Sequence, residues 1–241
     1  MKSTSSASPA APFSQPFAPS TGEKPETFAI LGRVAGCVWF SVVTLFYAQP
    51  LLVMIRALRP GDLGFADLAP IASRICTLIF FVTLGWLMLA RRTSVARAEG
   101  FAPIAISLLG TYGVWSVGFL PLTTNSPAIA MVSAAITLVG SVLIILAIAY
   151  LGRSFSISPQ ARALVTSGPY AIVRHPLYLA EEIAIVGVLF QIEWYAAIPF
   201  LIAHLALQIS RMRYEESLLR SVFPEYADYA RRTARLIPGV W

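Results

Sequence analysis

Charged side chains are scarce in this sequence. Only 12% of its 241 residues are Asp, Glu, Lys or Arg, whereas 57% are hydrophobic. A soluble domain carries about 25% charged residues, so the composition excludes an ordinary soluble protein and indicates an integral membrane protein. The formal net charge of +6 does not indicate a nucleic-acid partner, because the basic residues lie between apolar runs and are expected to face lipid headgroups.

Cysteine and histidine are also rare, with two of each. Cys37 and Cys76 lack the spacing of a metal site and fall in apolar runs, where a thiol usually serves as a small hydrophobic side chain. A disulfide between them is a minor alternative. His204 stands alone in an apolar run, either as a packing residue, which we favour, or as a functional group whose partner the sequence does not identify. We therefore expect no metal site.

The signature of a soluble nucleotide-binding fold is absent as well. No Gly-x-Gly-x-x-Gly run follows a strand pattern, and helical and strand patterns do not alternate. Any nucleotide-like cofactor must therefore be held in another way.

Long apolar runs dominate what is present. A membrane-spanning helix needs about 20 apolar residues. The first four runs have about that length, whereas the last two are shorter and are separated by residues 191–193. We interpret the short pair as a tight helical hairpin; a re-entrant pair that does not cross fully is the alternative. The fold class is thus predicted to be all-α, a polytopic transmembrane helical bundle of about six spans. The runs are 29–55, 71–90, 101–122, 128–151, 179–190 and 194–209.

Basic residues set the expected orientation of this bundle. Arginines follow the second run at 91–97 and recur throughout the C-terminal third, so this side is expected to be cytoplasmic. The uncharged turn at 121–127 falls on the opposite side. Arg56 and Arg59 also fall there, against the rule. Both chain ends are predicted to lie in the cytoplasm.

Three regions are expected along the chain. Residues 1–27 are rich in Ser, Pro and Ala and should form a disordered tail. Residues 28–152 hold the first four transmembrane helices, and residues 153–241 form a core that holds the polar motifs. Within this core, residues 214–241 have an amphipathic pattern and are expected to form a helical tail at the cytoplasmic face.

The most informative stretch is LVTSGPYAIVRHPLY at 164–178, where glycine, proline, aromatic and basic residues interrupt the apolar pattern. Pro176 suits the first turn of a helix, so Arg174 and His175 are expected at a helix N-terminus beside the membrane. Free backbone N–H groups and the helix dipole favour an anionic group there, and an arginine can bind a carboxylate with two hydrogen bonds. Alternatively, both basic residues are headgroup anchors.

A second polar cluster, RMRYEE at 211–216, ends the last apolar run on the same predicted side. Arg211 and Glu215 are four residues apart and share a helix face, so the simplest interpretation is a solvated helix with an ion pair. With Tyr170 and Tyr178, however, the two clusters supply both signs of charge and aromatic rings. Such a set suits S-adenosylmethionine, a zwitterion with a sulfonium that aromatic rings can face.

These residues resemble a known family. TSGPYAIVRHPLY, followed later by EESLLRSVFPEY, resembles the isoprenylcysteine carboxyl methyltransferase family, which is related to the membrane phospholipid methyltransferases. The resemblance covers about 158–238, and the joint pattern of GPY, RHPxY, EExL and FxxY is more specific than any one piece. It implies a helical membrane enzyme that transfers a methyl group from S-adenosylmethionine.

Carried over residue by residue, the resemblance implies a set of site residues. Catalytic roles fall on Arg174, His175 and Arg211, and Arg211 matches a position that contacts the methyl acceptor. Glu216 is added to the cofactor contacts as the neighbour of Glu215. The expected cofactor-binding residues are Arg162, Ala163, Leu164, Val165, Tyr170, His175, Pro176, Leu177, Tyr178, Glu215 and Glu216.

The sequence departs from the family pattern at two places. Arg162 stands where the relatives place histidine. Glu181 and Glu182 follow the motif where many relatives have apolar or small residues, and two carboxylates in an apolar helix are costly in lipid. They are expected to face the pocket, to pair with Arg174 or Arg211, or to lie at headgroup depth.

The sequence therefore predicts a multi-pass membrane methyltransferase that uses S-adenosylmethionine, with its active site facing the cytoplasm. Its expected partners are membrane lipids and an amphiphilic or small acceptor, a carboxylate, amine or thiol, that enters from the bilayer. Neither a nucleic acid nor a metal is expected. Two rivals are an intramembrane sterol-type reductase that binds NADPH, and a non-catalytic membrane subunit or transporter that uses the arginines as anchors.

Overall fold

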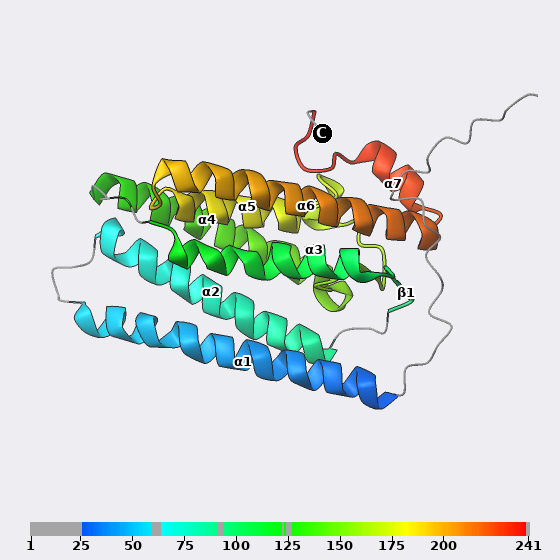
Figure 1. The fold of residues 1–241 in the computed structure, drawn as a ribbon, viewed down its shortest axis with the longest axis horizontal. Coiled ribbons are helices and arrows are strands. Elements are labelled where there is room, and N and C mark those ends of the chain that lie inside the picture. Colours follow the sequence, from blue (N-terminus) through cyan, green and yellow to red (C-terminus); the bar gives the residue numbers. More distant parts are fainter. Residues whose placement is uncertain (1–25, 59–63, 91–93, 122, 124–126, 240–241) are drawn as a thin grey trace, which may run out of the picture.

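The computed structural model describes residues 26–58, 64–90, 94–121, 123 and 127–239. The long helices of this part run side by side in an elongated bundle (Figure 1). The helices are α1 (Glu26–Ala57), α2 (Phe65–Ala90), α3 (Phe101–Tyr112), α4 (Pro127–Leu151), α5 (Pro176–Leu189), α6 (Trp194–Val222) and α7 (Tyr226–Arg232). Shorter elements are the 3-10 helices η1 (Gly113–Phe119), η2 (Gly152–Ser154) and η3 (Gly168–Ala171) and the paired strands β1 (Ala96–Arg97) and β2 (Gln160–Ala161).

Four of the described helices, α1, α2, α4 and α6, are long and apolar enough to cross a membrane. Helix α3 is shorter, and 3-10 helix η1 follows it directly. Large apolar side chains are exposed along the bundle, as at Phe46 (72% exposed) and Trp86 (66% exposed), where lipid would cover them. The predicted all-α polytopic fold is confirmed, the six apolar runs correspond to α1–α6, and the protein is an integral membrane protein.

Three details complete or correct the expectations from sequence. Helix α1 begins at Glu26, inside the range predicted as a disordered tail, and residues 1–25 lie outside the described part. The predicted hairpin is present, because α5 and α6 are joined by a short turn at 190–193. Cys37 and Cys76 are free thiols, so the disulfide alternative is wrong.

Helices α4 and α5 approach closely because glycine lies at their contact. A Cβ atom on Gly140 would lie 2.4 Å from the backbone nitrogen of Ala184, and one on Gly187 would lie 2.6 Å from the backbone nitrogen of Thr137. Small residues let membrane helices pack backbone to backbone. This contact fixes α5, and with it the motif that begins the helix.

The segment after α6 turns back towards the start of α5 (Figure 1). The backbone N–H of Arg174 donates to the carbonyl oxygen of Ala234 (2.8 Å), and the N–H of His175 donates to that of Arg235 (3.1 Å). Helix α7 buries Tyr226 and Tyr229. The predicted amphipathic tail is therefore helical over α7, and it closes over the motif.

Candidate functional site

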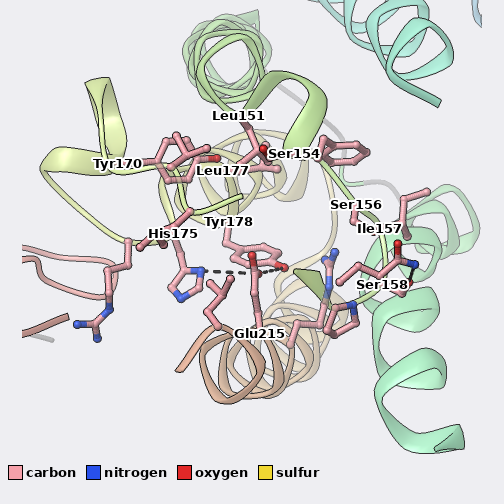
Figure 2. A pocket seen from close by; sticks show the side chains of 18 of the residues that line it. Leu151, Ser154, Ser156, Ile157, Ser158, Tyr170, His175, Leu177, Tyr178 and Glu215 are labelled. Carbon is pink, nitrogen blue, oxygen red and sulfur yellow. Dashed lines mark hydrogen bonds and ion pairs between the residues drawn. The ribbon is translucent and has the colours of Figure 1, made fainter. Parts of the chain in front are cut away.

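A cavity of about 100 Å³, here called the first cavity, lies between the two polar clusters (Figure 2). His175 and Tyr178, from the start of α5, and Glu215, from α6, point towards one another across it. Most of the predicted site residues line this cavity. They are Ala163, Leu164, Val165, Tyr170, Arg174, His175, Leu177, Tyr178, Arg211 and Glu215.

Three predicted cofactor contacts do not line the first cavity. Arg162 follows strand β2, and its Nη2 donates to Oε1 of Gln160 (2.5 Å). Pro176 is buried as the first residue of α5, so it shapes the helix start. Glu216 is 3% exposed and has basic partners on other elements.

Glu215 is the carboxylate that faces the first cavity. Its Oε2 accepts a hydrogen bond from the Tyr178 hydroxyl (2.9 Å) and lies 3.9 Å from Nδ1 of His175. The Glu215 side chain is 36% exposed, so it can still accept hydrogen bonds from a ligand. The Arg211 guanidinium lies over the Tyr178 ring, 4.8 Å from its centroid, so a cation covers the face of the ring whose hydroxyl contacts the Glu215 carboxylate.

Glu216 is the hub that holds the motif together. Its Oε1 lies 3.1 Å from Nε of Arg174 and 3.1 Å from Nε2 of His175. Its two oxygens also accept hydrogen bonds from Nε and Nη2 of Arg235 (2.9 and 2.7 Å). These hydrogen bonds raise the pKa of the Arg235 guanidinium. A buried carboxylate is tolerated when it is paired and hydrogen-bonded in this way, so Glu216 orients His175 towards the cavity.

Arg174 joins the motif to the C-terminal segment. Besides its contact with Glu216, its Nη1 donates to the carbonyl oxygens of Ala230 and Thr233. The planar guanidinium therefore braces the segment that follows α6. Since Nε and Nη1 are engaged within the protein, the geometry favours bracing over the direct grip of a ligand carboxylate that the sequence suggested.

Three tyrosines enclose the far side of the first cavity. The Tyr229 hydroxyl donates to the carbonyl oxygen of Tyr170 (2.6 Å). Burial raises the pKa of Tyr229 to about 12 and also raises that of Tyr170, so both phenols remain protonated at neutral pH. The hydroxyl groups of Tyr170 and Tyr226 are buried and have no hydrogen-bond partner within the described ranges. These two hydroxyl groups in the cavity wall can therefore donate hydrogen bonds to a ligand.

Several lining residues were not anticipated. Tyr226 is the tyrosine of the FxxY part of the family pattern and Tyr229 lies three residues after it, but neither was expected to line the cavity. The segment 154–160 crosses the mouth of the cavity (Figure 2) and carries no local signal of its own. Phe80 and Leu84 of α2 and Thr111 of α3 come from distant parts of the chain, and only the packed bundle brings them to the site.

Glu181 and Glu182 have separate surroundings. Oε2 of Glu181 accepts a hydrogen bond from Nε2 of Gln208 (2.7 Å) and lies 3.8 Å from Nη1 of Arg211. Glu181 also lines the first cavity. It therefore both faces the pocket and lies near Arg211, which are two of the three placements predicted for it. Glu182 is buried and pairs with a different residue, His204.

His204 has the partner that the sequence did not identify. Its Nδ1 lies 2.7 Å from Oε1 of Glu182, and its Nε2 lies 3.2 Å from the carbonyl oxygen of Gly110. A carbonyl oxygen can only accept a hydrogen bond, so Nε2 carries a hydrogen. The three residues link α3, α5 and α6. Across the described ranges, no group of three or more His, Cys, Asp or Glu side chains could hold a metal ion.

A protein-family model matches the part of the chain that holds most of these site residues. Residues 133–221 match the family model of the isoprenylcysteine carboxyl methyltransferase (ICMT) family, which confirms the resemblance drawn from the motifs. The matched range contains the whole of the motif at 164–178 and both glutamates of the second cluster.

Two metal-resistance proteins are similar to about a third of this chain. The cobalt-zinc-cadmium resistance protein CzcN of Cupriavidus metallidurans is 43% identical over 76 residues, 31% of this chain and 35% of that protein. The nickel-cobalt-cadmium resistance protein NccN of Alcaligenes xylosoxydans xylosoxydans is 40% identical over 80 residues, 33% of this chain and 38% of that protein. This chain thus spans little more than a third of each relative's length.

A solved structure is similar at lower identity. The eukaryotic intramembrane Ras methyltransferase ICMT superposes with a TM-score of 0.43 and 14% sequence identity, covering 89% of this chain and 97% of that chain.

Proposed function

We propose that this protein is a multi-pass membrane methyltransferase that binds S-adenosylmethionine in the first cavity. The observation that carries the proposal is the joint placement of Glu215, Tyr170 and Tyr226 around one cavity beside the family motif. The match of residues 133–221 to the methyltransferase family model supports it. The proposed methyltransferase core is 153–241, and residues of α2, α3 and α4 complete the cavity wall.

The chain offers a partner for each part of this cofactor. The unpartnered hydroxyls of Tyr170 and Tyr226 can donate to its adenine or ribose. Glu215 can accept from its ammonium or ribose hydroxyls, and Nε of Arg211, a buried donor with no partner in the described part, can donate to its carboxylate. The remaining expected contacts are apolar or backbone groups of residues 163–165, Leu177 and Tyr178, which line the same cavity.

The chemistry that bound S-adenosylmethionine supplies is a direct displacement at its sulfonium methyl carbon. The protein's part is to orient and to exclude water. Glu216 contacts both Arg174 and His175 and so holds His175 in place. The C-terminal segment closes over these residues through backbone hydrogen bonds. We assign Arg174 a positioning role, His175 a cavity contact and Arg162 a supporting role at the rim.

The cytoplasmic placement of the site remains part of the proposal. Arg97 in β1 pairs through its backbone with Gln160 in β2, and Nε of Arg153 donates to the carbonyl oxygen of Ala90 (2.6 Å). These arginines therefore gather at the end of the bundle that carries β1 and α7 (Figure 1), and clustered arginines mark the cytoplasmic side. The acceptor is a carboxylate, an amine or a thiol that enters from the bilayer.

Cofactor binding is the direct test. The full chain, purified in detergent micelles, is titrated calorimetrically with S-adenosylhomocysteine and, separately, with NADPH. We expect S-adenosylhomocysteine to bind at micromolar concentration or tighter and NADPH not to bind. Preference for NADPH would indicate the reductase alternative, and binding of neither would indicate a non-catalytic membrane protein. Transfer of a labelled methyl group in membranes that contain the protein then identifies the methylated product.

A further inference from the structure

A second cavity of about 290 Å³ lies inside the bundle, beside the first. Its wall is mostly aromatic and aliphatic and comes from α1 to α6, with Phe40, Phe81 and Ile185 among its members. Four residues line both cavities and form the wall between them: Phe80, Leu84, Thr111 and Glu181. A molecule in the second cavity would therefore meet a molecule in the first cavity at this shared wall.

Two oxygen atoms of the shared wall, Oε1 of Glu181 and Oγ1 of Thr111, can accept hydrogen bonds from a ligand. Both protein contacts of Glu181 use Oε2, and Oε1 accepts no hydrogen bond from the part of the chain that the structure describes. The Glu181 side chain is 25% exposed, which leaves this oxygen accessible. Oγ1 of Thr111 is buried and unpartnered among the described residues. Its lone pairs can accept a second hydrogen bond from the same donor group.

The arginines that line the first cavity, Arg174 and Arg211, do not line the second cavity. None of the described arginines or lysines lines it. Arg211 lines the first cavity only, and its Nη1 is occupied by Oε1 of Gln208 (2.7 Å) and lies near Glu181. His204 lines the second cavity, but both its ring nitrogens are engaged by Glu182 and Gly110. An anionic group in this cavity would face the Glu181 carboxylate, whose cation Arg211 lies near the other carboxylate oxygen, Oε2, and lines only the first cavity.

We propose, on the basis of the proposed methyltransferase function, that the second cavity binds the methyl acceptor and that this acceptor is an amine with a compact apolar body. The acceptor reacts as the neutral amine: its N–H groups donate to Oε1 of Glu181 and Oγ1 of Thr111, its lone pair stays free to receive the methyl group, and Glu181 can take up the proton that the nitrogen then loses. The apolar body fills the space inside the aromatic wall. An engineered apolar cavity of about 150 Å³ holds benzene, so 290 Å³ suits a body about twice that size. Glu181 is the residue that selects an amine over a carboxylate.

The test uses three probes that share one apolar body and differ in the head: 4-phenylbutylamine, 4-phenylbutanol and 4-phenylbutanoate. Cys76 lines the second cavity and is a free thiol, so a bound probe should shield it from N-ethylmaleimide. The full chain with Cys37→Ser is alkylated in detergent micelles with each probe. We expect the amine to slow alkylation of Cys76 at least tenfold at saturation and the carboxylate to have no effect.

Variants assign the selectivity to named atoms. Glu181→Gln should raise the amine concentration needed for protection at least tenfold and allow the carboxylate to protect. Thr111→Val, which keeps the side-chain shape, should raise the amine concentration needed for protection several-fold. Glu99→Gln changes an exposed carboxylate outside both cavities and should leave protection by the amine unchanged. Equal or better protection by the carboxylate in the unmodified site, or unchanged amine protection in Glu181→Gln and Thr111→Val, would overturn the proposal.

Titration with S-adenosylhomocysteine separates this inference from the proposed function. If S-adenosylhomocysteine binds and no probe shields Cys76, the acceptor proposal is wrong and the methyltransferase proposal stands. If the amine shields Cys76 and S-adenosylhomocysteine does not bind, the second cavity is an amine site in a protein that is not a methyltransferase.

Discussion

His175 and Glu216 are joined by a buried contact of 3.1 Å between Nε2 and Oε1, and each side chain is only 4% exposed. The same carboxylate also binds Arg174 and Arg235. One glutamate therefore fixes the histidine of the motif, the arginine beside it and the segment after α7. Four of the predictions below concern this arrangement and the cavity in front of it.

Glu216→Gln should destabilise the protein as well as weaken cofactor binding. The amide leaves the Arg174 and Arg235 guanidinium groups without their carboxylate, and breaking a buried ion pair on one side costs about 3–5 kcal/mol. We expect a lower midpoint of thermal unfolding in detergent. Glu225→Gln, an exposed glutamate at the start of α7, is the matched control. Equal midpoints for the two variants would show that the hub is dispensable.

Glu215→Gln should act on affinity alone. Within the part of the chain that the structure describes, Glu215 accepts a hydrogen bond from Tyr178 and is partly exposed, so the fold does not depend on its charge. A charged hydrogen bond to the cofactor contributes about 1.5–3 kcal/mol, which is about ten- to a hundredfold in affinity. Calorimetric titration with S-adenosylhomocysteine measures the change. Unchanged affinity in a folded variant would remove Glu215 from the site.

Arg174→Lys and His175→Gln should each reduce methyl transfer at least about tenfold while insertion into the membrane stays intact. Lysine lacks the planar fork that reaches Glu216, Ala230 and Thr233 together, and a tenfold loss corresponds to about 1.4 kcal/mol in the barrier. Rates at limiting and saturating cofactor distinguish binding from positioning. Full activity in both variants would leave only a role as headgroup anchors.

Tyr226→Phe should weaken cofactor binding without destabilising the protein, whereas Tyr229→Phe should destabilise the protein. The Tyr226 hydroxyl is buried without a described partner, so its removal should leave the stability of the free protein unchanged or raise it, and lower cofactor affinity about two- to tenfold. The Tyr229 hydroxyl bonds to Tyr170, so its removal should lower stability by about 1 kcal/mol. Thermal unfolding with and without S-adenosylhomocysteine measures both. A destabilised free Tyr226→Phe would contradict this assignment.

Deletion of Met1 to Lys24 should leave expression and activity unchanged, because the Ser, Pro and Ala content of this stretch cannot build a core. The deleted protein is compared with the full chain in membranes at equal amounts. Normal insertion combined with lost activity would reveal a role for this stretch in the reaction.

The parts of the fold that depend on local pattern could be predicted from sequence. Apolar runs gave the positions of α1 to α6, and Pro176 gave the start of α5. The family pattern gave residues from both sides of the first cavity. The FxxY part of that pattern contains Tyr226, but only the fold shows that this tyrosine lines the cavity.

The parts that depend on distant packing could not be predicted. Glu216 looked like a second cofactor ligand because it neighbours Glu215, yet adjacent helix positions point in different directions, and its partners lie 42 and 19 residues away at Arg174 and Arg235. His204 looked isolated because Glu182 lies on another helix. Burying a carboxylate in lipid is unfavourable without a partner, and the structure supplies that partner across helices.

The backbone bonds from Arg174 and His175 to Ala234 and Arg235 also impose an order on assembly during synthesis. The apolar helices precede Ala234 and Arg235 in the chain, so they can form before these residues are made, but the motif at 164–178 is not closed until the chain has emerged past Arg235. A stop codon within α7 would therefore give a protein that a membrane-integration assay would score as normal although its motif at 164–178 is left open.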